Sequence, residues 1–263
     1  MWPLYLAVII LGLLIGSFLN VLIIRLPEKQ TWWGKARSMC RRCLKKLYLR
    51  DLIPVFSFIK LHGRCRFCQE KISWQYPIIE IITALLFVLA FHYNAFISFH
   101  DYVSLLRDFI FLAVLIVVFV IDLKHLLIID RLIYVMMPIA FFLNWFIADW
   151  NISVALNMLL AAGAGFLFYW FQYYFSRGRW VGDGDMWLTA LLGLMLGTSG
   201  LLFTIFGAYI VGGVIATILL LTKKRQVGAQ LPMGAFLTPM AVLMILWGDL
   251  IWNGYWNIIY KIL

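Results

Sequence analysis

The chain has 263 residues, of which 64% are hydrophobic and only 13% are charged, and its mean hydropathy is +0.94. Soluble domains usually contain about 45–50% apolar and about 25% charged residues. These values exclude a soluble globular enzyme, a disordered chain and a disulfide-rich secreted domain. They predict an all-α polytopic membrane protein with about eight transmembrane helices and one modest soluble module.

The amino-terminal apolar run, residues 2–24, is the first predicted transmembrane helix. A signal peptide is the alternative interpretation. However, no basic region precedes the run, no small-residue cleavage site follows it, and it is too long for a signal sequence. The run ends at Arg25 and Pro27, as a spanning helix would.

Residues 25–77 differ from the rest of the chain, because they hold 13 lysines and arginines and all four cysteines. They are the one predicted soluble insertion, which divides the chain into a first helix (1–24), a loop domain (25–77) and a membrane-embedded domain (78–263). Glu80 and Asp108 are expected at helix ends and Asp101 in a loop. Further spans are expected near 78–97, 108–126, 132–148, 152–175, 186–198, 200–221 and 235–251. The aromatic stretch from Asp249 onward suits an interfacial helix.

The lysines and arginines predict the orientation. With the amino terminus outside and residues 25–77 in the cytoplasm, 20 of the 22 basic residues lie inside, and only Arg107 and Lys261 lie outside. The opposite orientation would reverse the positive-inside rule. The net charge of +10 is therefore explained by the orientation of the chain in the membrane, which places a basic face against anionic lipid headgroups, and it does not indicate nucleic-acid binding.

The four cysteines form two CxxC pairs, Cys40 with Cys43 and Cys65 with Cys68, separated by 21 residues. This spacing is typical of four-thiolate zinc ribbons. Thiols stay reduced in the cytoplasm, which argues against disulfides. Four sulfur ligands leave no position for water, so the pattern predicts a structural zinc ion. A redox role and free thiols are the alternatives.

Two pairs of carboxylates lie at predicted cytoplasmic helix ends: Asp122 with Asp130, and Asp183 with Asp185 in the sequence GDGD. Ionisable groups at the edge of a membrane are costly and indicate function. Asp122 lies near the end of the third predicted span and Asp185 in the first turn of the sixth. Two such aspartates can share one proton and activate a water molecule, as in aspartic proteases. Proton coupling and helix capping are the alternatives.

The helix dipoles predict different roles for the two aspartates. A helix carboxyl end, near Asp122, carries partial negative charge, whereas a helix amino end, near Asp185, carries partial positive charge. We therefore expect Asp185 to be the ionised member that activates water and Asp122 the protonated member.

Seven segments, in order, resemble the type IV prepilin peptidases, which are bifunctional leader peptidases and N-methyltransferases. They are GSFLNVLIIRLP (16–27), the two CxxC pairs, DLIPVFSFIKLHGRCRFC (51–68), YPIIEIITALLF (76–87), IDLKHLLIID (121–130), GDGD (182–185) and LPMGAFL (231–237). The resemblance implies that Asp122 and Asp185 are catalytic, that Asp130 flanks the first, and that Cys40, Cys43, Cys65 and Cys68 bind zinc.

The chain departs from the family pattern at four positions. Ile129 stands where the family usually has proline, Trp187 where lysine is common, and Met233 and Ala235 where phenylalanine and proline flank the final glycine. Both catalytic aspartates are retained. The departures therefore bear more on substrate preference and methyl transfer than on proteolysis.

The resemblance implies a substrate and a reaction. The substrate would be a prepilin or pseudopilin with a short basic leader, cut after a glycine at the cytoplasmic face of a bacterial inner membrane. The new amino-terminal residue would then be methylated from S-adenosylmethionine. The sequence contains no Gly-rich dinucleotide fingerprint, so the soluble loop and adjoining helix ends are the expected donor site. A proton-coupled transporter, a peptidase without methyl transfer and a non-enzymatic assembly factor are the alternatives.

Overall fold

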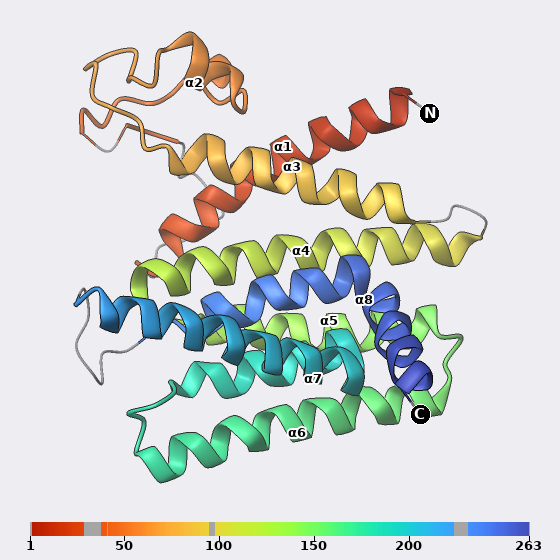
Figure 1. Ribbon diagram of the computed structural model, residues 1–263. Coiled ribbons are helices and arrows are strands. Elements are labelled where there is room, and N and C mark those ends of the chain that lie inside the picture. The colour runs from red at the N-terminus through yellow and green to blue at the C-terminus, as the bar shows by residue number, and fades with distance from the viewer. Residues whose placement is uncertain (1, 29–37, 41, 95–97, 224–230, 263) are drawn as a thin grey trace. The chain divides into compact units, whose positions relative to one another are not determined.

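The computed structural model describes residues 2–28, 38–40, 42–94, 98–223 and 231–262 (Figure 1). Within these residues the chain is all-helical apart from two isolated β-bridges, as predicted. Its elements are α1 (Trp2–Arg25), η1 (Leu49–Asp51), α2 (Phe56–Lys60), α3 (Gln75–Tyr93), α4 (Phe99–His125), α5 (Asp130–Ile147), α6 (Ile152–Ser176), α7 (Asp183–Leu221) and α8 (Gly234–Ile262). Parts of three predictions lie outside the described residues. They are residues 29–37 and 41 of the loop domain, residues 95–97 of a span, and the cytoplasmic cations Lys224 and Arg225.

The described helices that could cross a membrane number seven, namely all but α2. Tertiary contacts divide the chain into two compact units. Unit 1 contains residues 1–95 together with 112–117, and unit 2 contains residues 96–111 together with 118–263. The division of the sequence into a first helix, a loop domain and a membrane domain stays a prediction.

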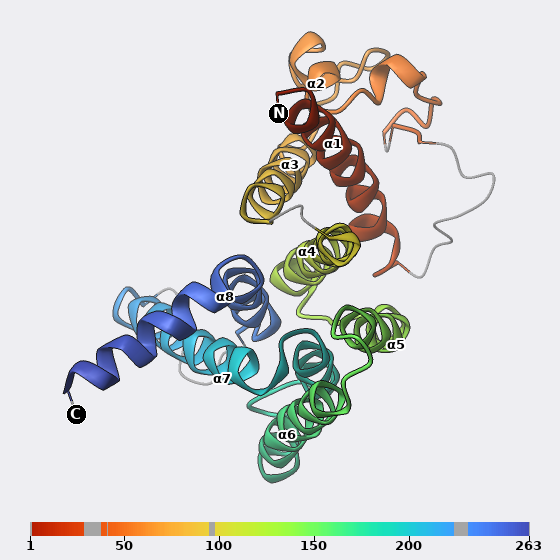
Figure 2. The same cartoon turned by 90° about the vertical axis from the view of Figure 1, so that its right-hand side faces the viewer.

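In unit 1, α1 and α3 lie side by side (Figure 2). Gly12 and Gly16 of α1 permit this approach. A Cβ atom at Gly12 would lie 2.5 Å from Ala84 Cα, and one at Gly16 would lie 2.7 Å from Glu80 Cα. Small residues four apart let two membrane helices pack backbone to backbone.

The sequence predicts Glu80 at a helix end. In the structure it lies in the second turn of α3, where it is buried. Its Oε2 accepts a hydrogen bond of 2.7 Å from the amide of Val55, just before α2. Buried carboxylates need such partners. Glu80 therefore ties the loop residues of unit 1 to α3.

Helix α4 begins nine residues earlier than the predicted 108–126. Asp101, expected in a loop, lies in its first turn, where its Oδ2 accepts a hydrogen bond of 2.7 Å from the amide of Ser98. This contact caps the helix start. As a result, Asp108 lies well inside α4 and does not mark its end.

Helix α7 contains 39 residues, about 58 Å at ~1.5 Å per residue. That is nearly twice the ~30 Å hydrocarbon core of a bilayer. The helix is broken at Gly197, whose φ of 67° and ψ of −173° are not helical. The break separates residues 183–196 from 198–221, which agrees with the two predicted spans at this place.

The chain reverses direction at Gly197 (Figure 1). Three hydrogen-bonded pairs between α6 and α7 record the reversal: Asn157 with Thr198, Gly165 with Thr189, and Gln172 with Tyr209. From residue 157 to residue 165 of α6, the partner in α7 changes from Thr198 to Thr189, so the first segment of α7 runs antiparallel to α6. From residue 157 to residue 172, the partner changes from Thr198 to Tyr209, so the second segment runs parallel to α6. The two segments are therefore antiparallel, and with them the helices supply about eight spans.

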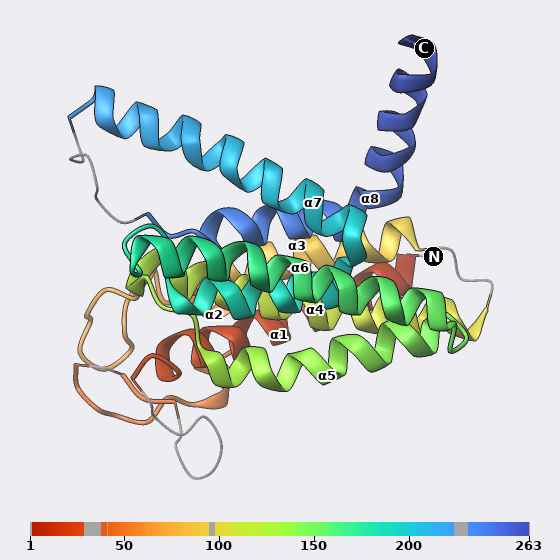
Figure 3. The same ribbon diagram turned by 90° about the horizontal axis from the view of Figure 1, so that it is seen from below.

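Helix α8 bends at Trp247, where φ is −133° (Figure 3). The residues that follow belong to the stretch predicted to lie at the membrane interface. The bend comes four residues before the predicted end of the last span at 251. Figure 3 shows the carboxyl-terminal part of α8 leaving at a steep angle to the first part. The interfacial placement itself stays a prediction.

Candidate active site

Asp122 lies in the last turn of α4 and is 4% exposed. Its Oδ2 accepts a hydrogen bond of 2.7 Å from the amide of Ala235, in the first turn of α8. The preceding residue must be small, because a Cβ atom at Gly234 would lie 2.9 Å from the same oxygen. Asp122 thus meets the amino terminus of a helix from a distant part of the sequence.

Asp185 lies in the first turn of α7 and is 6% exposed. Its Oδ2 accepts a hydrogen bond of 2.9 Å from the amide of Gly182, directly before the helix. The carboxylate therefore caps its own helix. Asp183, two residues earlier, is exposed and accepts a hydrogen bond of 3.0 Å from the amide of Gly184.

The start of α7 packs against the residues around Asp122. A Cβ atom at Gly184 would lie 2.7 Å from Ile128 Cβ, and one at Gly234 would lie 3.3 Å from Leu188 Cδ2. The two carboxylates are close enough to interact electrostatically. The structure therefore brings together the two buried aspartates, whereas Asp130 and Asp183 are exposed.

Aromatic side chains surround this part of α7. Trp187, where the family pattern has lysine, packs edge-on against Tyr134 of α5 with ring centroids 5.1 Å apart, and against Phe166 of α6 at 4.9 Å. An apolar ring suits this setting between helices better than an ammonium group would. The departure at Trp187 is thus accommodated by its neighbours.

Two tyrosines near Asp185 are not among the site residues that the sequence predicts. Tyr169 of α6 is fully buried, and Tyr209 comes from the second segment of α7. Both are close enough to Asp185 to interact with it electrostatically. No local sequence pattern marks them, because the reversal at Gly197 is what brings residue 209 back toward residue 185.

The four cysteines converge in unit 1. Their sulfur atoms all lie within 4.8 Å of one another, and Cys40 Sγ lies 3.7 Å from Cys68 Sγ. A tetrahedral zinc ion with bonds of about 2.3 Å requires sulfurs roughly 3.8 Å apart. The cluster therefore fits one metal ion, as the sequence predicts.

Two matching turns present these sulfurs. The amide of Cys40 donates to the carbonyl of Lys45 at 3.0 Å, and the amide of Cys65 donates to the carbonyl of Glu70 at 2.8 Å. In each turn the residue directly after the second cysteine, Leu44 or Gln69, has a positive φ. Because both CxxC pairs adopt the same turn, each directs two thiols toward the other.

An ion pair supports the second turn. Asp51, at the end of η1, is buried and accepts a hydrogen bond of 3.0 Å from Arg66 Nε, beside Cys65. The Arg66 guanidinium holds the pKa of the Asp51 carboxyl below its ordinary value. The ionised carboxylate therefore stabilises the folded loop.

A groove of about 780 Å³ also lies in unit 1, between α2 and the start of α3. Phe58 and Trp74 lie on its wall with ring centroids 4.9 Å apart. The charged residues of the wall are the cations Arg64 and Lys71. The groove thus offers aromatic surfaces and positive charge, which suit a ligand with a planar ring and a carboxylate.

Comparisons with known proteins agree with these features. A family model described as the Bacterial Peptidase A24 N-terminal domain matches residues 10–94, and one described as the Type IV leader peptidase family matches residues 109–217. No solved structure matches the chain at a significant level.

Curated relatives match over nearly the whole chain. A prepilin leader peptidase/N-methyltransferase of Stutzerimonas stutzeri is 30% identical, covering 95% of this chain and 93% of its own length. Relatives of the same name from Bacillus subtilis and Pectobacterium carotovorum are 31% and 33% identical. The alignments cover 94% of this chain and 95% of the Bacillus protein, and 87% of this chain and 88% of the Pectobacterium protein.

Proposed function

The chain belongs to the type IV leader peptidase family, and we propose that it cleaves prepilins or pseudopilins with Asp122 and Asp185 as its catalytic pair. The substrate has a short basic leader and is cut after a glycine. The same enzyme methylates the new amino-terminal residue. A proton-coupled transporter is not favoured, because the relatives that span nearly the whole chain carry the peptidase name.

The observation that carries the proposal is the burial of two carboxylates from separate helices, each hydrogen-bonded to the backbone at a helix amino terminus. A pair of nearby buried carboxylates retains one proton between them because two negative charges repel each other. One ionised and one protonated carboxyl group form the acid–base pair that amide hydrolysis needs.

The reaction follows from that pair. The ionised aspartate removes a proton from a water molecule while the protonated aspartate donates a hydrogen bond to the scissile carbonyl oxygen. The water oxygen then adds to the carbonyl carbon. Collapse of the tetrahedral intermediate breaks the carbon–nitrogen bond, and the leaving amine takes up a proton from the pair.

For methyl transfer, the groove between α2 and α3 is the proposed site of S-adenosylmethionine, which supplies an electrophilic methyl group. Phe58 and Trp74 would contact the adenine ring, and Arg64 and Lys71 would pair with the carboxylate of the donor. The groove lies in the loop and adjoining helix start, which is the region in which the sequence predicts the donor site. The bound donor would give its methyl group to the pilin amine, which would lose a proton, and S-adenosylhomocysteine would be the leaving group.

Zinc is the proposed occupant of the four-cysteine cluster. Borderline-soft zinc favours thiolate ligands in tetrahedral geometry, and all four ligands are supplied by the chain. Such an ion would hold the two CxxC turns together, and with all four positions filled by sulfur it would have no open position for a role in cleavage. The ion pair between Asp51 and Arg66 supports the same turns.

The proposal is tested by co-expressing a prepilin with Asp122→Asn or Asp185→Asn and measuring leader loss by mass spectrometry. We expect each variant to lose cleavage by roughly 10²–10⁴-fold or more, because an amide can neither retain the shared proton nor deprotonate water. Asp130→Asn and Asp183→Asn are matched controls, since these residues are exposed, and they should have milder effects. Retained cleavage in either variant of the pair would refute the aspartyl mechanism.

The same spectra report methylation of the product's first residue. Arg64→Gln with Lys71→Gln should lower methylation and leave cleavage intact, because the groove and the aspartates serve different steps. A product that is never methylated by the unaltered enzyme would identify a peptidase without methyl transfer.

A further inference from the structure

The helix segment that carries Asp185 is short and ends inside the protein. Residues 183–196 extend about 21 Å at ~1.5 Å per residue before the break at Gly197. The last carbonyl groups of a helix have no partner within it. Inside a membrane such groups must be satisfied by other residues.

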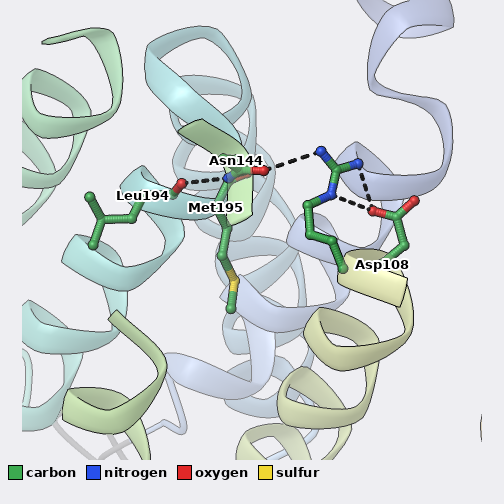
Figure 4. Close-up of polar contacts among 5 residues, drawn as sticks. Asp108, Asn144, Leu194 and Met195 are labelled. Carbon is green, nitrogen blue, oxygen red and sulfur yellow. Dashed lines mark hydrogen bonds and ion pairs between the residues drawn. The ribbon is translucent and has the colours of Figure 1, made fainter. Parts of the chain in front are cut away.

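Asn144, near the end of α5, supplies those partners (Figure 4). Its Nδ2 donates to the carbonyl oxygens of Leu194 at 2.8 Å and Met195 at 3.1 Å. Its Oδ1 accepts a hydrogen bond of 3.1 Å from Arg107 Nη1 of α4. Asn144 thus links the far end of the Asp185 segment to α4.

Arg107 is in turn held by its neighbour. Its Nε and Nη2 donate to Asp108 Oδ1 at 2.9 and 2.8 Å (Figure 4). Arg107 is one of only two basic residues that the charge distribution leaves outside, so topology does not explain it. The asparagine gives it a role, because a fixed guanidinium fixes the orientation of the Asn144 amide.

The second segment of α7 is capped separately. Asn157 of α6 accepts a hydrogen bond of 3.0 Å from the amide of Thr198 and donates one of 2.8 Å to its hydroxyl. Each side of the break is therefore capped by an asparagine from a neighbouring helix. Of these two asparagines, Asn144 caps the segment with Asp185 and accepts a hydrogen bond from Arg107 of α4.

We propose that Asn144, oriented by Arg107, is a positioning residue that sets the register of Asp185 against Asp122; this inference rests on the proposed catalytic pair. Helix α4 carries Arg107 and Asp122 about 22 Å apart. The segment with Asp185 packs at Gly184 against Ile128, just after this helix, and Asn144 links its other end to Arg107. A segment held at both of its ends resists sliding along α4, and a shift of about 1 Å between catalytic groups costs on the order of 100-fold in rate.

The test compares Asn144→Leu with Asn157→Leu in the purified full-length enzyme. Both changes remove an asparagine cap from the same break, so both should lower the unfolding temperature similarly. We expect Asn144→Leu to lower kcat for prepilin cleavage by about 10- to 100-fold with KM changed less than about twofold. Asn157→Leu should change kcat by less than about twofold.

Arg107→Gln tests the orienting contact separately, because it keeps Asn144 and its hydrogen bonds to the carbonyl groups of Leu194 and Met195. Like Asn144→Leu, this variant should lower kcat for prepilin cleavage. It takes the place of Asn144→Leu in the test if that variant is not recovered folded. Equal loss of kcat in the Asn144 and Asn157 variants, or normal kcat in both Arg107→Gln and Asn144→Leu, would overturn the inference. Asp122→Asn and Asp185→Asn run in the same assay separate the two hypotheses, since their retained activity would instead refute the catalytic pair.

Discussion

At the scale of single residues, the least expected feature is the amide of Ala235. It donates a hydrogen bond to Asp122, 113 residues earlier in the chain. The resemblance places proline at this position in the family, and proline has no amide hydrogen to donate. The departure at Ala235 therefore adds one contact to the carboxylate of Asp122, which we propose to be catalytic.

Replacing Ala235 with proline tests that contact. Proline is tolerated in the first turn of a helix, so the fold should persist. Loss of one hydrogen bond costs about 0.5–1.5 kcal/mol, so we expect kcat for prepilin cleavage to fall about two- to tenfold. Ala235→Gly keeps the amide and should retain the original rate. Equal rates in the proline and glycine variants would show that the contact does not serve catalysis.

The same contact removes the basis of the expected division of roles. The sequence places Asp122 at a helix carboxyl end and Asp185 at a helix amino end. The structure gives both carboxylates a helix amino terminus, α8 for Asp122 and α7 for Asp185. Because both meet partial positive charge, the dipoles give no reason for Asp185 to be the ionised member.

Residue types and spacing were enough to propose Asp122, Asp185 and the four cysteines as site residues. The family motifs are local, and each lies within a few residues along the chain. The amide of Ala235 and the hydroxyls of Tyr169 and Tyr209 could not be predicted in this way. Their positions near the two aspartates arise from contacts between helices that are far apart in sequence.

At the scale of elements, the sequence predicts long apolar helices well and their ends less well. The start of α4 was missed because hydropathy falls around Arg107 and Asp108, whereas the cap at Ser98 lies further upstream. The break in α7 was predicted as two spans. The hydrogen bonds that stabilise this break could not be predicted, because Asn144 and Asn157 come from other helices.

The loop of unit 1 is the element most dependent on a ligand. Its described part contains only η1, α2 and two bridges, so little regular structure holds the CxxC turns together. Structural zinc commonly contributes on the order of 10 kcal/mol to the folding of a small module. We expect one zinc per chain, and Cys40→Ser or Cys65→Ser should lower the zinc content and expose residues 38–74 to protease.

Elemental analysis of the purified enzyme measures its zinc content. Limited proteolysis before and after chelation measures how strongly the loop depends on the metal. Lys60→Gln is a control, since it changes the charge of the same loop without touching a cysteine. A metal-free enzyme with full activity and a protease-resistant loop would contradict the prediction.

At the scale of the whole molecule, the break at Gly197 decides the number of spans and hence the side on which the chain ends. If α7 crossed once, seven spans would leave the two termini on opposite sides of the membrane. Because its two segments are antiparallel, eight spans return the carboxyl terminus to the side of the amino terminus. The proposed orientation, with the amino terminus outside, then puts the carboxyl terminus outside.

Reporter fusions to the inner-membrane protein test the count and the orientation together. Alkaline phosphatase, which is active only outside, should be active when fused after Leu263 and inactive when fused after Lys223. A cytoplasmic fluorescent reporter should give the reverse pattern. Both fusion points follow α7, and one span, α8, lies between them. Phosphatase activity after Lys223 would mean that α7 crosses once or that the chain is inverted, and a fusion after Arg25 distinguishes these. The positive-inside rule predicts that the fusion after Arg25 is cytoplasmic, which is the side on which we propose that Asp122 and Asp185 cleave the leader.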